Sequence, residues 1–262
     1  LCVGADGAGA AALEPDADAP ARWAEAAPRI FRDVEGLRGV IALAPPGRGP
    51  KGRRPAPAGT RPPPAIFGDP VVERAAPLAP GVRLLHRPDA FAQANAAANE
   101  ALVRAAVEGL DLVSGAEVLE LYAGAGNFTF ALAARGAKVT AVEREGASLA
   151  LARRAAEAAG IESVRFVAAD AALAARDFAQ AGRRFDAVLL DPPRAGAKGI
   201  AAAIAALRPA RVAWVSCEPA AMARDLSDLV RAGHRVVRTV PVDMFPQTFH
   251  VEAVALLAPA RR

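Results

Sequence analysis

The chain has 262 residues, of which 53% are hydrophobic and 23% are charged, and its formal net charge is +4. This length is enough for one or two globular domains with a hydrophobic core. No apolar run reaches the ~18 residues that a membrane span needs. Two distant cysteines are too few for a disulfide framework, or for a zinc or iron–sulfur site built from this chain alone. From this cysteine usage we expect a protein of the reducing cytoplasm. The positive charge permits a nucleic-acid partner through phosphate contacts, although an Arg-rich composition without functional meaning gives the same charge.

Residues 1–88 are expected to form a smaller α+β segment. The first residues, LCVGADGAGAAAL, contain no basic stretch, so we expect no signal peptide, and the missing initiator Met fits a fragment or a processed chain. A helix is expected over residues 20–37, before a short apolar run. Residues 44–64 are rich in Pro, Gly and Arg, which indicates a solvated loop or linker whose five cations could contact phosphate. Strands are expected at 65–75 and 81–88.

Residues 89–262 show a regular alternation of short apolar strands and helices. A helix of good helix formers is expected over 91–110. Strands are expected at 116–123, 137–143, 164–170, 185–191 and 210–217, and each is followed by a helix. Two further strands, 234–242 and 250–259, have no helix between them, so the last strand should run antiparallel to the others. This pattern predicts an α/β, Rossmann-like domain with a mostly parallel sheet buried on both faces.

The ends of the first three strands carry residues suited to a nucleoside cofactor, because ligands of open α/β sheets bind at the carboxyl ends of the strands. Gly124 and Gly126 allow the backbone to turn tightly and approach a ligand before a helix; the alternative is a plain strand-to-helix turn without a ligand. Thr129 stands where the pyrophosphate fingerprint has its third glycine, so that fingerprint is incomplete. Glu143 can accept both ribose hydroxyls, or be a solvated carboxylate. Asp170 can accept from an adenine amino group, or cap a helix. A cofactor without a pyrophosphate, such as S-adenosylmethionine, fits this set.

The next strand ends carry a carboxylate and a thiol. Asp191 opens the stiff segment DPPRAGA, and Cys217 ends the following strand. Glu252 interrupts the apolar run of the last strand, where a buried carboxylate is costly unless it is paired or used. The antiparallel topology places Glu252 beside Cys217. The same sheet edge is therefore expected to hold the cofactor site, the thiol and the carboxylate.

Methyl transfer to carbon 5 of a pyrimidine needs these groups. A thiolate adds to carbon 6, and a base later removes the proton from carbon 5, so Cys217 is the expected nucleophile and Glu252 the expected base. Asp191 can accept from the N3–H of uracil, a hydrogen that cytosine lacks. The target base must be unpaired or flipped out of a stack.

The motifs of residues 89–257 together resemble the RNA uracil-5 methyltransferases that modify tRNA or large-subunit rRNA. The matching segments are FAQANAAANE, LELYAGAGNFTFALA, DPPRAGA, VSCEPAAMARDL and PVDMFPQTFHVEAVALL. The resemblance implies S-adenosylmethionine as cofactor, rRNA or tRNA as partner, and Cys217 and Glu252 as catalytic residues. It also implies that the cofactor and target-base pocket is lined by Gln93, Tyr122, Asn127, Glu143, Asp170 and Asp191. If the chain is complete, the RNA contacts are expected from residues 1–88 and the Arg-rich surface.

Three departures from the family pattern keep alternatives open. Glu218 replaces the usual Asn after the cysteine, and its negative charge would disfavour a thiolate. The oligonucleotide-binding barrel and the four-cysteine iron–sulfur cluster of many members are missing from the sequence. One alternative is an RNA cytosine-5 methyltransferase, which usually carries a second cysteine where this chain has DPPR. Another is an RNA-binding remnant of the same fold that has lost turnover.

Overall fold

The computed structural model describes residues 2–3, 7–13, 20–43, 65–93 and 95–260, and the expected loop at 44–64 lies outside them. The chain divides into two compact units. The smaller unit comprises residues 1–74 and 85–92, and the larger one comprises residues 75–84 and 93–262. Among the described residues, no helix has the length and apolar character needed to cross a membrane.

The smaller unit is built on a four-stranded sheet with the order β1 (Cys2–Val3), β2 (Gly9–Leu13), β3 (Leu37–Ala42) and β4 (Ala65–Gly68). Strands β2 and β3 are parallel, and helix α1 (Pro20–Asp33) connects them. Ala27, Ile30 and Phe31 of α1 pack against the buried side chains of Val40 and Ala42. The unit thus contains both strands and a helix, as expected for an α+β segment, and the helix connects two parallel strands.

The expected strand at 65–75 is divided in two. Strand β4 ends at Gly68, and strand β5 (Val72–Ala75) follows after a turn in which Asp69 Oδ1 accepts from the Val71 backbone N–H. Pro70 has no N–H to donate to a ladder, which explains the break. Strand β5 forms a two-stranded sheet with β6 (Arg83–His86).

The larger unit contains a seven-stranded sheet with the order β12-β13-β11-β10-β7-β8-β9. The strands are β7 (Glu117–Leu121), β8 (Lys138–Glu143), β9 (Val164–Ala168), β10 (Ala187–Leu190), β11 (Arg211–Ser216), β12 (His234–Val242) and β13 (Glu252–Pro259). The pairs among β7 to β11 are parallel, whereas β13 is antiparallel to both of its neighbours. The predicted Rossmann-like fold and the predicted direction of the last strand are therefore confirmed.

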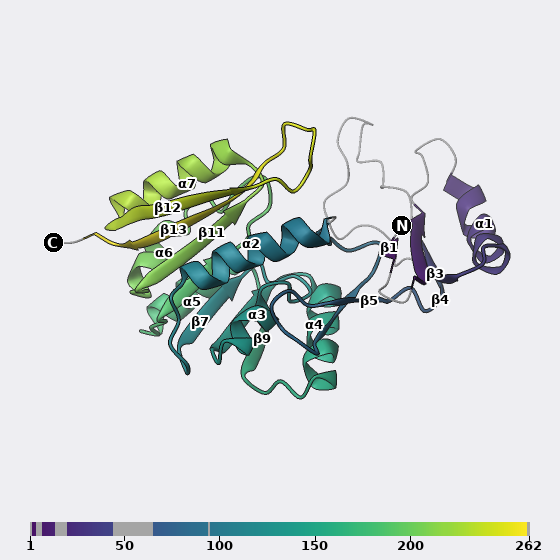
Figure 1. Cartoon of the computed structure of the whole chain (residues 1–262), viewed down its shortest axis with the longest axis horizontal. Helices are drawn as coiled ribbons and strands as arrows, with labels where there is room; N and C mark the ends of the chain where they lie inside the picture. The colour runs from purple at the N-terminus through teal and green to yellow at the C-terminus, as the bar shows by residue number, and fades with distance from the viewer. Residues whose placement is uncertain (1, 4–6, 14–19, 44–64, 94, 261–262) are drawn as a thin grey trace. The chain divides into compact units, whose positions relative to one another are not determined.

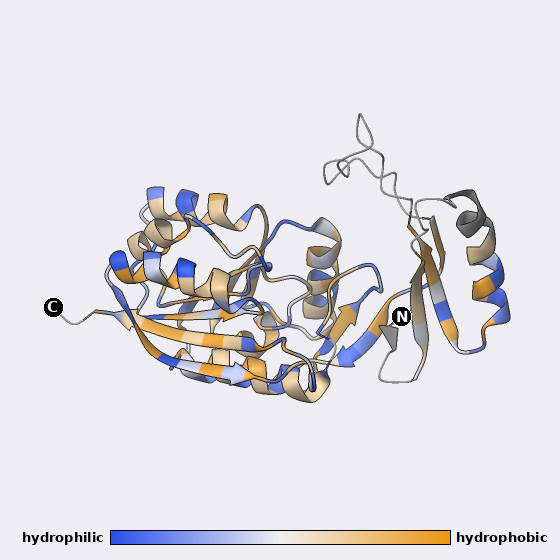
Figure 2. Cartoon of the chain, turned by 90° about the horizontal axis from the view of Figure 1, so that it is seen from above, coloured by the Kyte–Doolittle hydropathy of each residue, from blue (hydrophilic) through white to orange (hydrophobic). Residues whose placement is uncertain are grey.

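Helices cover both faces of this sheet (Figure 1). Helices α2 (Ala96–Gly109) and α3 (Thr129–Ala134) pack on one face, where Leu102 and Val118 are buried. Helices α5 (Ala171–Gln180), α6 (Ala201–Ala206) and α7 (Pro219–Arg231) pack on the other, where Leu119 and Trp214 are buried. Helix α4 (Gly146–Ala158) contacts β8 and β9. Burial on both faces requires apolar residues at consecutive strand positions, and Figure 2 shows the hydrophobic strands that result.

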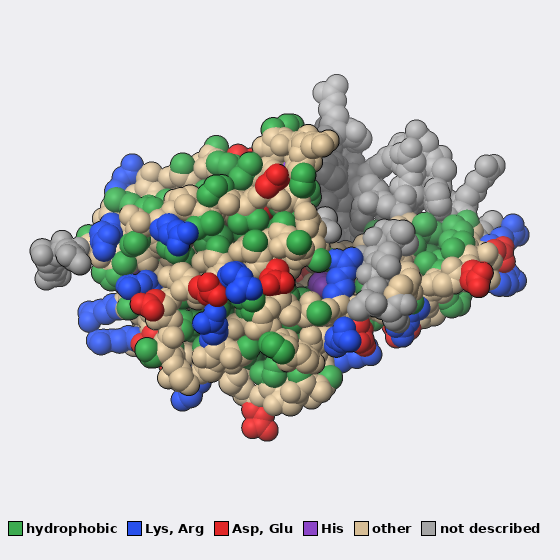
Figure 3. Space-filling model, in the orientation of Figure 1, with side chains coloured by type: hydrophobic (Ala, Val, Ile, Leu, Met, Phe, Trp, Pro, Cys, Tyr) green, Lys and Arg blue, Asp and Glu red, His purple; other side chains and the backbone are tan. Residues whose placement is uncertain are grey.

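Helix α2 begins later than predicted. The residues from 91 onward are good helix formers, but the helix starts at Ala96, because Asn95 has extended backbone angles and its Oδ1 accepts from the Ala98 N–H at 3.1 Å. On its exposed side, Arg104 pairs with Glu100 and Glu108. Figure 3 shows acidic and basic side chains intermingled along the face on which α2 lies. Arg104 already has carboxylate partners, so the exposed side of α2 is not a continuous cationic surface.

Candidate active site

The turn between β7 and α3 brings the backbone close to the carboxyl edge of the sheet. Gly124 has φ +56° and Gly126 has φ +99°, both in the left-handed region that favours glycine. A side chain at Gly126 would lie 2.6 Å from the Phe130 ring, whereas one at Gly124 would meet open space. The turn therefore leaves room for a ligand at Gly124 in particular.

Glu143 ends β8 and lies against this turn. Its Oε2 accepts from the Gly124 N–H at 2.9 Å, and its Oε1 accepts from the Glu145 N–H at 2.7 Å. Because each carboxylate oxygen has two acceptor sites, the group remains able to accept hydroxyl donors while these bonds fix its orientation.

Tyr122 and Asp170 lie near Glu143. Tyr122 has a left-handed backbone, φ +64°, which is strained for a non-glycine residue. Burial raises the pKa of its phenol, and the negative charge of Asp170 raises it further. Asp170 caps α5, since its Oδ1 accepts from the N–H groups of Ala172 and Leu173 at 3.0 and 3.1 Å. The helix-cap interpretation of Asp170 therefore holds, and its other oxygen remains for a further role.

Asn127 is held by a residue that the sequence did not single out. The side-chain amides of Asn127 and Asn99 exchange two hydrogen bonds of 2.8 and 2.9 Å, and Asn99 on α2 is buried. Gln93 is partly buried two residues before the cap of α2. Helix α2 thus fixes the orientation of a side chain in the glycine turn.

The thiol and the carboxylate of the predicted catalytic pair come together. Strands β11 and β13 pair Ser216 with Ala253, so Cys217 and Glu252 are the next two residues in this antiparallel register. Burial raises the pKa of Glu252, which is only 5% exposed, while the positive charge of Arg194 lowers it. Asp191, at the end of β10, has its pKa raised to about 7, first by burial and then by the charge of Glu252.

Arg194 is the cation of this site, and sequence reasoning missed it although it belongs to DPPRAGA. Burial raises the pKa of the Cys217 thiol, and the charges of Glu252 and Asp191 raise it further. The positive charge of Arg194, whose guanidinium lies near the thiol, acts in the opposite direction. Arg194 is therefore the group that favours the thiolate.

Glu218 has a different place from the one expected for it. It is the N-cap of α7, and its Oε1 accepts from the Ala220 N–H at 3.4 Å. The carboxylates whose charges raise the Cys217 pKa are those of Glu252 and Asp191. Glu218 thus caps the helix that follows the cysteine, at the position where the family usually has Asn.

Glu120, in the middle of the same sheet, was also missed. It is 1% exposed, its Oε2 accepts from the Thr129 hydroxyl at 2.6 Å, and its Oε1 has no hydrogen-bond partner. Burial raises its pKa to about 8, with smaller contributions from Asp191 and Glu143. The signal was available, because Glu120 interrupts an apolar strand as Glu252 does. In the part of the chain that the structure describes, no His, Cys, Asp and Glu side chains gather as metal ligands would.

Comparisons with known proteins identify a family that this chain matches. The family model described as tRNA (Uracil-5-)-methyltransferase matches residues 82–260. A 23S rRNA (uracil(1939)-C(5))-methyltransferase RlmD from Alkalilimnicola ehrlichii is 45% identical over 195 residues, which cover 73% of this chain and 44% of that protein. The protein of the same description from Pseudomonas fluorescens is 44% identical over 177 residues, or 67% of this chain and 38% of that protein.

The solved structures include a similar fold with a ligand. The tRNA (uracil-54, C5)-methyltransferase of Pyrococcus abyssi, in complex with S-adenosyl-L-homocysteine, superposes with a TM-score of 0.66 at 27% identity. The match covers 87% of this chain and 53% of that one. The chain thus spans less than half the length of the curated relatives described above.

Proposed function

The chain belongs to the tRNA (uracil-5-)-methyltransferase family, and from this premise we propose that it methylates carbon 5 of a uridine in RNA with S-adenosylmethionine as methyl donor. The observation that carries the proposal is the placement of Cys217 next to Glu252 at the carboxyl edge of the sheet, where the charge of Glu252 also acts on Asp191. A pyrimidine C5 methyltransferase needs a nucleophile and a base that reach the same ring, and neighbouring positions on two paired strands provide this.

The cofactor site is proposed to lie along the glycine turn. Gly124 borders open space, Glu143 is oriented with acceptor capacity left, and Tyr122, Asn127 and Asp170 lie around them. Together with Gln93 and Asp191, these residues would hold S-adenosylmethionine, which supplies an electrophilic methyl group when bound. An acidic pocket of this kind also suits a ligand that carries positive charge.

The chemical steps of the chain's own residues follow from their charges. The Cys217 thiolate adds to carbon 6 of the base and makes carbon 5 nucleophilic. After methylation, Glu252 takes the proton from carbon 5, and the thiolate leaves as the 5,6 double bond forms again. The pKa of Glu252 is raised by burial, which makes it a stronger base than an exposed carboxylate. Arg194 offsets the burial that opposes ionisation of the thiol.

Asp191 is proposed to select uracil. Its ionised carboxylate accepts from uracil N3–H, whereas cytosine presents a lone pair there and is repelled. Because the pKa of Asp191 is raised to about 7, this selection should strengthen as the pH rises through neutrality. The same argument speaks against an RNA cytosine-5 methyltransferase.

An RNA partner is supported by an exposed aromatic side chain close to the catalytic pair. Phe249 lies in the segment between β12 and β13, three residues before Glu252, and is 89% exposed. Its ring centroid lies 4.2 Å from that of His250. Unpaired RNA bases stack on such rings. The names of the relatives point to large-subunit rRNA or tRNA as the substrate, and a role in RNA modification would place the protein in the cytoplasm.

The test uses the chain with tritiated S-adenosylmethionine and with rRNA and tRNA from a strain that lacks uracil-5 methylation. We expect label in 5-methyluridine of one RNA pool and none with Cys217→Ala. Glu252→Gln should instead accumulate a covalent RNA–protein adduct, because the proton of carbon 5 is no longer removed. If the folded wild-type chain gives neither label nor an adduct with 5-fluorouracil RNA, the proposal is wrong and the RNA-binding remnant is the better interpretation.

A further inference from the structure

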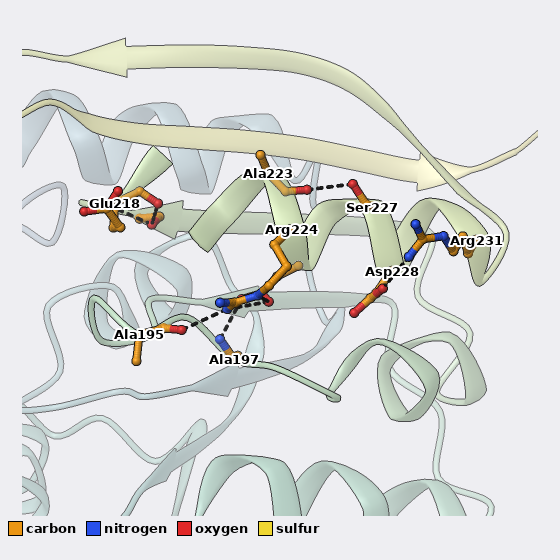
Figure 4. A network of polar contacts seen from close by, with 10 residues as sticks. Ala195, Ala197, Glu218, Ala223, Arg224, Ser227, Asp228 and Arg231 are labelled. Carbon is orange, nitrogen blue, oxygen red and sulfur yellow. Dashed lines mark hydrogen bonds and ion pairs between the residues drawn. The ribbon is translucent and has the colours of Figure 1, made fainter. Parts of the chain in front are cut away.

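The segment of residues 191–197, which carries Asp191 and Arg194, is fastened to helix α7. The Arg224 Nη2 donates to the Ala195 carbonyl at 2.8 Å, and the Ala197 N–H donates to Asp225 Oδ2 at 2.7 Å. Arg224 and Asp225 are also paired with each other, with Nη2 and Oδ1 2.7 Å apart. Figure 4 shows Arg224 extending from α7 toward Ala195 and Ala197.

These contacts hold the backbone of the segment at Ala195 and Ala197. Asp225 is 3% exposed, so its charge depends on Arg224 and on the Ala197 N–H. Gly196 has φ +79°, and a side chain there would collide with Asp225 and Arg224. A buried carboxylate that loses one partner is left uncompensated, which is strongly unfavourable. The carboxylate of Asp225 therefore depends on the 191–197 segment and on Arg224, whose own side chain is 45% exposed.

These contacts join the two segments that lie on either side of the thiol, helix α7 and residues 191–197. Helix α7 begins two residues after Cys217, and the segment that α7 holds carries Arg194. The charged groups that act on the thiol are Glu252 from β13 and Asp191 and Arg194 from the 191–197 segment. Of these three, Arg194 alone favours the thiolate. A small displacement of the segment would move Arg194 away from the thiol, whereas the buried carboxylate of Glu252, on β13, would stay in place.

We propose that Arg224 and Asp225 are positioning residues that hold the 191–197 segment so that Arg194 stays close to the Cys217 thiol. The pair touches no reacting atom in this scheme, and it acts through Arg194. The importance of the thiolate rests on the proposed function, but the positioning itself is a property of this chain. It can therefore be measured without RNA.

The experiment follows alkylation of Cys217 by iodoacetamide against pH, in the full chain with Cys2→Ser, by mass spectrometry. Arg224→Ala should raise the apparent pKa of the thiol by about half a unit to one unit, which slows alkylation near neutral pH about three- to tenfold. Arg224→Lys keeps the charge but not the fork that reaches both Asp225 and Ala195, so a smaller shift is expected. The matched control is Arg231→Ala, which breaks an exposed ion pair with Asp228 on the same helix and should change nothing.

A double-mutant cycle separates positioning from general loosening. Arg194→Ala should raise the thiol pKa by itself, and Arg224→Ala should add nothing in that background. The proposal is overturned if folded Arg224→Ala and Arg224→Lys alkylate as the wild type does, or if Arg224→Ala has the same effect with and without Arg194. If Arg224→Ala does not fold, the proposal is tested with Arg224→Lys instead, alone and combined with Arg194→Ala. Failure of RNA methylation, by contrast, would contradict the proposed function and leave this result standing.

Discussion

At the scale of single residues, the amide pair of Asn99 and Asn127 gives the first prediction. Asn99→Leu leaves the Asn127 amide without the two hydrogen bonds that fix it, and we expect S-adenosylhomocysteine to bind about five- to twentyfold more weakly, since each lost bond is worth ~1 kcal/mol. Asn99→Asp keeps one acceptor and should lose about half of this free energy. Isothermal titration calorimetry measures both. Glu100→Gln, on the exposed side of the same helix, is the control; equal affinities for all folded variants would contradict the prediction.

Glu120 gives a prediction about pH. Its pKa is about 8 in the folded chain and 4.5 as its ordinary value, so between these values the folded state holds a proton that the unfolded state has released. This contribution to stability is complete below pH 4.5 and is lost as the pH rises to about 8, at up to ~1.4 kcal/mol per pH unit. Asp191, whose pKa is about 7, contributes in the same direction.

The check is the free energy of unfolding in denaturant at several pH values across this window. Glu120→Gln should show a smaller fall in stability than the wild type does, because the amide does not titrate, and the difference isolates Glu120 from Asp191. Thr129 can still donate to the amide oxygen. Identical pH slopes for the two proteins would show that Glu120 is not buried with a raised pKa.

At the scale of elements, the two glycines of the β7–α3 turn should differ in effect. Gly126→Ala puts a methyl group 2.6 Å from the Phe130 ring and keeps φ at +99°, so we expect a loss of about 2–4 kcal/mol in unfolding free energy. Gly124→Ala meets open space and should cost only about 1 kcal/mol for its backbone angle. Because that space is the proposed cofactor site, Gly124→Ala should weaken S-adenosylhomocysteine binding instead. Thermal unfolding and calorimetry on both variants test this, and equal destabilisation would be inconsistent with the close approach of Gly126 to Phe130.

The elements also show what the sequence could predict. The alternation of apolar strands and helices was enough to find β7 to β13 along the chain, but not their order in the sheet. The missing helix before β13 was enough for its direction, and hence for the position of Glu252 beside Cys217. The start of α2 was wrong, because helix propensity says nothing of the side-chain cap at Asn95. The bonds of Asn99 to Asn127 and of Asp225 to Ala197 join segments 28 residues apart. Neither the hydrophobic periodicity of the sequence nor the spacing of its motifs reveals such tertiary contacts.

At the scale of the whole molecule, the boundary between the units matters. The sequence placed it at residue 88, where the strand-and-helix alternation begins. The contacts assign residues 75–84 to the larger unit, in which Leu78 packs against the core formed by α2, α3 and the sheet. All residues proposed for catalysis and cofactor binding also belong to this unit, from Gln93 to Glu252. A short segment that looks like part of the smaller unit in sequence thus completes the hydrophobic core of the larger one.

Two fragments test this assignment, one of residues 75–262 and one of residues 89–262. The longer fragment should bind S-adenosylhomocysteine as tightly as the full chain does, because its core and its proposed cofactor residues are complete. The shorter one loses the contact of Leu78, which is partly buried against this core, about 0.5–1.5 kcal/mol, and should unfold roughly 1–6 °C lower. Leu78→Ala in the longer fragment is the matched control and should reproduce most of this decrease. If both fragments unfold at the same temperature, residues 75–84 do not stabilise the larger unit, and the boundary belongs at residue 88 after all.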